Sequence, residues 1–276
     1  MSQASQTVFT LNPAQYVKAV DQLRKGFIAQ FTKVIKADFK AEQNKLFKTA
    51  TSNTVEGKAD QIINNVDRFY DPTIVYERMY VAVYPVLAER EFDKLLPSKN
   101  MGRGFERKGS AEQVAEWERA ALQFVADDLG SMITAVEAFS HDVVVRHTRA
   151  IAEKAVKQGW GTGKFASALR ADLDTLDLMR SIRIARTEIL TAASVGTHAG
   201  AVSTGLKLSK TWLTVPGNGG DRHGEDIAYS GLNNQTVGRD ELFTLTAGIT
   251  AQTPHDISLP GSERINCVCS HLYTPI

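Results

Sequence analysis

Residues 178–213 read LMRSIRIARTEILTAASVGTHAGAVSTGLKLSKTWL, an alanine-rich stretch that runs into short apolar segments. Its apolar residues recur at spacings of three and four, the period of one helix face: Leu178, Ile182, Ala185, Ile189 and Ala192. After Gly205 the chain changes to turn residues and short segments such as 212–215, which is typical of strands and loops. The sequence therefore predicts an α+β fold, with a mainly helical N-terminal body and a small, mixed C-terminal cap.

The helical pattern extends upstream to about residue 13, where Asn12-Pro13 provides an N-cap and a first-turn proline. The first helix has an apolar face at Tyr16, Val20, Leu23, Phe27 and Phe31. A second helix is predicted after Asp71-Pro72, with an apolar face at Val75, Met79, Val83 and Leu87. Pro85 lies within it and predicts a kink or an early end.

A glycine-rich, basic loop is predicted over residues 97–110. A long helix follows and continues toward Val156, with one face formed by Val114, Trp117, Ala121, Phe124, Asp128 and Met132. Glycines at 159–163 are expected to end it, and two further helices are predicted near 164–173 and 178–206. The predicted regions are thus 1–108 (N-terminal helices), 109–206 (long-helix region) and 207–276 (cap).

Composition indicates an ordinary globular chain of 276 residues, with 43% hydrophobic and 23% charged residues. The net charge of +1 gives no global attraction to nucleic acid or anionic membranes, although residues 1–108 hold 17 Lys and Arg against 12 Asp and Glu. The longest apolar run, 79–88, is too short to span a bilayer. The two cysteines are two residues apart, which disfavours an unstrained disulfide and favours synthesis in a reducing cytoplasm.

Several residue groups follow one another in the last third of the chain. A helix carries Arg186-Thr187-Glu188; the tail then carries Trp212, Arg222-His223, Phe243 with Pro254, and Asn266-Cys267-Val268-Cys269. This order, over about residues 159–273, resembles the Mu F-like family of phage head-morphogenesis proteins. The family pattern usually has arginine between the cysteines, so any role of that arginine is absent here.

The resemblance implies a minor capsid (minor head) protein of a tailed bacteriophage, with no enzymatic activity and no cofactor. It implies synthesis in the host cytoplasm and a place in the virion, inside the capsid near the portal, in support of head assembly and DNA packaging or delivery. The implied partners are the portal protein, scaffold or major capsid protein, and packaged double-stranded DNA bound without sequence preference, with no membrane contact in the virion. Arg186, Thr187 and Glu188 are then interpreted as a clamp that holds the cap on the helix, with Arg222 and His223 locking the cap.

An enzymatic alternative rests on Glu188, His223 and Glu225. Glu188 has no ion-pair partner within one helical turn. A catalytic glutamate of the ADP-ribosyltransferase type is the alternative to the clamp. Residues 221–226 alternate carboxylates with an imidazole, as a metal-dependent nuclease would need. The flanking glycines make a plain turn the favoured interpretation.

Cys267, Cys269 and His271 also alternate, so an extended strand would place three candidate zinc ligands on one side. His223 or His255 would supply a fourth ligand. The Cys-x-Cys-x-His spacing is not a common structural zinc pattern, and buried cysteine often packs as a small apolar residue. We therefore predict no stoichiometric metal, with Asn266 supplying polar contacts to the preceding turn.

Two further patterns concern helix faces, one basic and one formed by small residues. One face of the first helix carries a stripe of four lysines, Lys33, Lys36, Lys40 and Lys48. Two acidic residues, Asp38 and Glu42, interrupt its positive charge. The lysines are candidate DNA contacts, although a solvated face is favoured. Ala192, Gly196 and Gly200 lie at i, i+4 and i+8, which predicts close approach of another element through internal packing rather than a binding interface.

Overall fold

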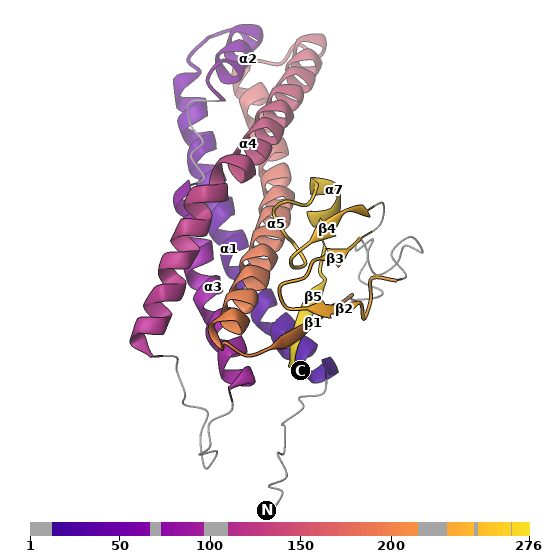
Figure 1. Ribbon diagram of the computed structural model, residues 1–276. Coiled ribbons are helices and arrows are strands. Elements are labelled where there is room, and N and C mark those ends of the chain that lie inside the picture. Colours follow the sequence, from indigo (N-terminus) through magenta and orange to yellow (C-terminus); the bar gives the residue numbers. More distant parts are fainter. Residues whose placement is uncertain (1–12, 67–72, 97–109, 215–230, 246–247, 266) are drawn as a thin grey trace, which may run out of the picture.

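The computed structural model describes residues 13–66, 73–96, 110–214, 231–245, 248–265 and 267–276, with backbone only for 13–17, 73–74 and 128–141. The predicted α+β class is confirmed: a long helical body carries a small C-terminal cap of antiparallel strands (Figure 1). The helices of the body are α1 (Pro13–Thr49), α2 (Val55–Ile63), α3 (Thr73–Leu95), α4 (Ala111–Lys157) and α5 (Thr162–Ser203).

The cap contains two small sheets and one short helix. Strand β1 (Leu208–Leu213) lies between β2 (Thr236–Gly238) and β5 (Ser270–Pro275), antiparallel to both. Strands β3 (Phe243–Thr244) and β4 (Thr250–Ala251) form a separate pair, and α7 spans Gly261–Arg264. The register places Trp212 opposite His271 and Lys210 opposite Tyr273.

Two helices of the body begin at side chains that cap their free backbone N–H groups. The hydroxyl of Thr54 accepts a hydrogen bond from the Gly57 N–H at the start of α2. The hydroxyl of Ser110 accepts one from the Gln113 N–H at the start of α4. Such N-caps satisfy donors that have no partner inside the helix.

The main core of the body joins α1, α3, α4 and α5 around buried side chains of α3, among them Tyr80, Val83 and Leu87. A second core lies at the end of the body that holds α2, around Phe165 and Leu169 of α5. In the cap, Trp212 is fully buried and contacts the edge of Phe243 at a ring distance of 5.1 Å. Trp212 therefore lies in the core of the cap.

Close packing of α3 on α5 confirms the interpretation of the small residues. A Cβ atom at Gly196 would lie 2.4 Å from the carbonyl oxygen of Tyr84, and one at Gly200 would lie 2.1 Å from that of Ala88. Both contacts are with backbone, so no side chain can move aside. Only glycine lets the two helices approach this closely.

Several local predictions were wrong. The segments 164–173 and 178–206 belong to one helix, α5. Leu178 is 39% exposed, because the buried face before Ala185 is formed by Leu169, Leu173 and Asp177 instead. Leu23 is also exposed, because α1 buries Arg24 beside Val20. Of the two outcomes predicted at Pro85, the early end is wrong, because helix α3 continues to Leu95, and the kink stays a prediction.

The remaining elements follow the sequence interpretation more closely. Val75, Met79, Val83 and Leu87 are buried on α3, and α4 reaches Lys157. No helix within the described ranges is long and apolar enough to cross a membrane. Of the loop predicted over 97–110, only Ser110 is described, and it caps α4.

Candidate functional site: the boundary between the long helix and the cap

The second half of α5 lies between the other long helices and the cap (Figure 1). Helix α3 packs along it on the body side, and β5 of the cap contacts it from the other. Its residues from Thr187 to Ser194 are consequently all buried, polar ones included. Polar groups in such a place need partners, so their partners define what the boundary does.

Glu188, the last residue of the Arg-Thr-Glu motif, is buried with 3% of its surface exposed. Its Oε2 atom accepts a hydrogen bond from the Tyr80 hydroxyl of α3, 2.9 Å away. Tyr80 stacks on Phe124 of α4, with ring centroids 5.3 Å apart. The direct partner of Glu188 thus belongs to the body, a partner that the sequence could not identify.

The charges around Glu188 come from the cap. Burial raises the pKa of Glu188, while the positive charge of Arg264, the Tyr80 hydrogen bond and His255 act to lower it. Burial, followed by the Glu188 charge and hydrogen bond, raises the pKa of Tyr80 well above its usual value. Glu188 is therefore a buried acid whose ionised form is favoured by Arg264 and His255 of the cap.

A second polar group lies further along α5, at His198. Its Nδ1 atom is 2.5 Å from the Tyr273 hydroxyl of β5, and its Nε2 atom is 3.4 Å from the Gln252 amide nitrogen. The same amide nitrogen donates to the Arg239 carbonyl oxygen, which can only accept and so fixes the orientation of the amide. Nε2 of His198 must then accept, which places the proton on Nδ1, where it is donated to Tyr273.

Lys210 of β1 belongs to the same group. Its side chain is fully buried on the inner face of β1, beside Leu208 and Trp212. Its Nζ atom donates to the Gln252 carbonyl oxygen at 2.6 Å and lies 4.9 Å from the centre of the Phe243 ring. Burial lowers the pKa of Lys210 to about 8, against the opposing effect of Asp240, Asp256 and Glu241.

A third link joins the cap to α3 directly. Lys94 donates to Glu91 at 2.7 Å and to the carbonyl oxygen of Tyr273 at 3.3 Å. Tyr273 therefore contacts α5 through its hydroxyl and α3 through its backbone. Taken together, these contacts make the boundary a polar joint that fixes the cap to two helices.

Sequence reasoning missed His198, Lys210 and Tyr273. A signal for Lys210 was present: it shares the alternating face of Leu208 and Trp212 on a strand whose inner face is apolar. A lysine at a core position implies a specific partner, since burial of an unpaired ammonium is costly. His198 and Tyr273 had no comparable signal, because they meet only through tertiary packing.

The cysteines and His271 lie in and beside the core of the cap. Cys267 and Cys269 are buried with Trp212, and the Cys269 N–H donates to the Cys267 sulfur at 3.4 Å. His271 is buried at an edge-on ring contact of 5.1 Å with Tyr273, and within the described chain neither of its ring nitrogens has a hydrogen-bond partner. Among the same described residues, no three His, Cys, Asp or Glu side chains come together as a metal site. The absence of a stoichiometric metal stays a prediction, because one candidate for the fourth ligand, His223, lies outside the described residues.

Some predicted site residues cannot be placed. Arg222, His223, Glu225 and Asn266 lie outside the described residues, so their predicted roles stay predictions. On α1, Lys33, Lys36, Lys40 and Lys48 are all exposed, as a solvated stripe requires. Lys40 pairs with Asp174 of α5 at 2.6 Å, so it is not free for phosphate. The stripe therefore offers a weaker positive surface than its sequence suggested.

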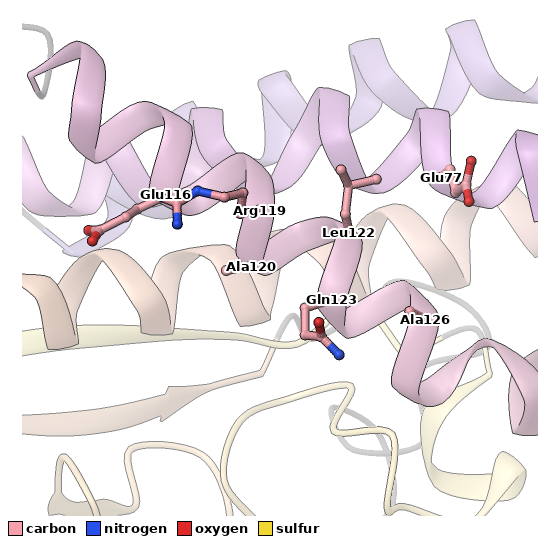
Figure 2. Close-up of a pocket in the computed structure, with 7 residues that line it drawn as sticks. All are labelled: Glu77, Glu116, Arg119, Ala120, Leu122, Gln123 and Ala126. Carbon is pink, nitrogen blue, oxygen red and sulfur yellow. The ribbon is translucent and has the colours of Figure 1, made fainter.

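A shallow hollow of about 730 Å³ lies on the outer surface of α3 and α4. Glu77 and Glu116 lie at its opposite ends, with Arg119, Leu122 and Gln123 between them (Figure 2). Leu122 is 46% exposed, and the two carboxylates do not converge on a common point. An arrangement of this kind does not form a catalytic pair.

Acid should weaken the boundary through His198. Burial, with Lys210 as a further cause, lowers the pKa of His198 to about 4. The unfolded chain, with a histidine pKa near 6.5, takes up this proton first, so stability is lost as pH falls from about 6.5 to about 4. The loss from this group should approach about 3 kcal/mol at the lower end.

Urea titrations at steps of pH between 7 and 4 measure this effect. His198→Gln keeps a neutral hydrogen-bonding side chain and should make the profile shallower over this range, while His271, whose pKa burial also lowers well below its usual value, still contributes to the loss. An identical pH profile in His198→Gln and the parent protein would contradict the assignment. Protonation also places an N–H of His198 against the Gln252 amide, so the cap should loosen before the body.

Comparisons of the chain with family profiles, with characterised proteins and with solved structures found no match.

Proposed function

We propose that the protein is a minor head protein of a tailed bacteriophage, of the Mu F-like kind. In this proposal it associates with the portal protein inside the procapsid and supports head assembly and the packaging or delivery of DNA. Its partners are then the portal protein, scaffold or major capsid protein, and double-stranded DNA. It acts as an assembly component without a cofactor and without catalysis.

The observation that supports this proposal is how the motif residues pack. Glu188, on the helix that carries Arg-Thr-Glu, interacts electrostatically with Arg264 and His255 of the cap. Trp212 and the two cysteines, which come from distant parts of the tail, share one buried core. The motif residues that the structure describes therefore lie together, in one helix and the cap packed on it. This arrangement is what we expect if the motif order marks a shared structural unit.

The burial of Glu188 favours a structural role over a catalytic one. A catalytic carboxylate must reach its substrate, whereas Glu188 is enclosed and hydrogen-bonded to Tyr80 inside the core. Burying a carboxylate is costly, and the joint supplies a hydrogen bond and a nearby positive charge to offset that cost. Such a group holds the cap in one position on the body.

Two observations test the proposal directly. The first is the composition of purified phage particles: the chain should be present in filled heads and should copurify with the portal protein. The second is the gene order, in which a portal gene should lie just upstream. Particles that lack the chain, or a chain that does not bind portal protein, would overturn the proposal.

Variants at Glu188 separate assembly from catalysis. Glu188→Gln keeps an oxygen that accepts from Tyr80 but removes the charge that faces Arg264, so we expect a folded chain with a somewhat less stable cap, and heads that are still filled and infectious. Glu188→Ala leaves the Tyr80 hydroxyl buried without its acceptor and should cost about 1–3 kcal/mol of stability. Normal folding with complete loss of infectivity in Glu188→Gln would instead indicate catalysis.

A further inference from the structure

The turn between α4 and α5 is closed by backbone hydrogen bonds and lies at the end of the bundle that holds α2, away from the cap (Figure 1). The Trp160 N–H bonds to the Ala155 carbonyl, and the Gly159 N–H bonds to the Val156 carbonyl. Gly159 has φ of +61°, so these bonds form a Schellman motif at the end of α4. The motif therefore defines the path of the backbone from α4 into α5 and so which residues meet at the turn.

The side chains around this turn are strongly basic. Residues 146–170 contain six Lys and Arg but a single acid, Glu153, in a chain whose net charge is only +1. Most of the basic side chains are exposed: Arg146, Arg149, Lys154, Lys157 and Lys164. None of the three lysines has a carboxylate within ion-pair distance among the residues that the structure describes.

Trp160 brings two of these lysines together. The Nζ atom of Lys164 lies 4.4 Å from the centre of the indole ring, and that of Lys154 lies 5.6 Å from it. Cation–π contact of this kind fixes flexible ammonium groups in place. Two like charges from different helices are thus held near one ring, an arrangement that an added anion would stabilise.

Helix dipoles do not explain this concentration of charge. Lys154 and Lys157 lie in the last turn of α4, where positive charge is favourable, but Lys164 lies in the first turn of α5, where it is unfavourable. The C-terminus of α4 and the N-terminus of α5 meet at the turn, and their opposite partial charges offset each other. The electrostatic potential at the turn is therefore positive because of the lysine side chains. On the α1 stripe, by contrast, Lys40 is already paired with Asp174.

We propose that this α4–α5 turn is a nucleic-acid site, in which Lys154, Lys157 and Lys164 contact the phosphates of double-stranded DNA without reading its sequence. Nucleic acid fits better than an anionic membrane, because Val156 is the one large apolar side chain exposed among residues 146–170, and Trp160 is partly buried beneath its lysines. The inference deepens the proposed function, on which it rests for the identity of the nucleic acid, by assigning the surface that contacts the double-stranded DNA. Binding to DNA and binding to portal protein are measured separately.

Binding of the full chain to a labelled duplex of mixed sequence tests the proposal. We expect binding at about 50 mM salt that weakens steeply by about 200 mM. The combined variant Lys154→Gln, Lys157→Gln and Lys164→Gln should bind at least about tenfold more weakly at the lower salt. The slope of log affinity against log salt should become shallower by about 2–3, roughly one unit for each phosphate that the variant no longer neutralises.

A charge-matched variant provides the control. Lys18→Gln, Arg119→Gln and Lys207→Gln removes three exposed charges that lie remote from the turn and outside the α1 lysine stripe, and it should retain most of the affinity and slope. An equal loss in both variants, or no duplex binding by the parent protein at low salt, would overturn the proposal. Circular dichroism establishes that each variant is folded before its affinity is compared.

Tryptophan fluorescence and lipid vesicles give independent checks. Trp117 and Trp212 are buried, so a change on adding DNA should come from Trp160 and vanish in Trp160→Phe. Vesicles of anionic phosphatidylglycerol should not compete with duplex DNA for the protein. Binding to such vesicles but not to duplex would show a membrane-binding surface and overturn the DNA assignment.

Discussion

Gly200→Ala is expected to remove about 3 kcal/mol from the stability of the helical body, the upper end of the usual cost of overpacking. The new Cβ atom would lie 2.1 Å from the carbonyl oxygen of Ala88 and 2.8 Å from its carbonyl carbon. Both atoms belong to the backbone of α3, a helix packed in the main core, so relief requires the two helices to separate. Separation would also disturb the Tyr80–Glu188 bond between the same helices.

Urea unfolding followed by far-ultraviolet circular dichroism measures this loss. Gly26→Ala is the matched control, because Gly26 lies inside α1 with no atom within 4 Å of a new Cβ. There alanine should stabilise the protein by about 1 kcal/mol through helix propensity. Equal stability of Gly200→Ala and the parent protein would show that α3 and α5 do not pack backbone to backbone.

The contrast between these glycines shows what the sequence could predict. Gly196 and Gly200 follow Ala192 at one-turn spacing, and that pattern correctly predicted close packing. It could not identify Tyr84 and Ala88 as the contacting residues, because the contact joins segments about a hundred residues apart. Periodicity describes a helix face, but tertiary packing decides what covers it.

The error at Leu178 has the same physical origin. A single apolar stripe was expected along the helix, but α5 passes different neighbours along its length. Near Leu173 it packs in the core at the α2 end, and beyond Ala185 it packs in the main core. Between them the buried positions are polar, with Arg180 donating to Asp177 at 3.1 Å. A rule that buries only apolar residues therefore places Leu178 wrongly.

The candidate site was predicted in part. The Arg-Thr-Glu motif identified Glu188 as a residue that needed a distant partner, and the structure shows such a partner in Tyr80. The His198–Tyr273–Gln252–Lys210 group was missed, because its members come from α5, β5, β4 and β1 or the turns beside them. Hydrogen bonds between remote segments leave no periodic signal in the sequence.

Trp212→Ala is expected to destabilise the cap by about 3–5 kcal/mol, the usual cost of truncating a buried aromatic residue. Trp212 fills the centre of the cap core, where it contacts Phe243 and packs with both cysteines. The cap is small and its sheets have few strands, so nearby packing cannot compensate for such a cavity. The cap should open while most of α1, α3, α4 and α5 stays helical.

The two cysteines report this opening directly. They are the chain's only cysteines, neither is in a disulfide, and both are buried beside Trp212, so a thiol reagent reacts with them only when the cap opens. A destabilisation of about 3–5 kcal/mol should speed labelling by at least about a hundredfold, up to the rate of the unfolded chain. Trp212→Phe keeps an aromatic ring in the core, so its cysteines should be labelled faster than those of the parent protein and more slowly than those of Trp212→Ala. Parental labelling in Trp212→Ala, with unchanged circular dichroism, would show that the cap does not depend on this side chain.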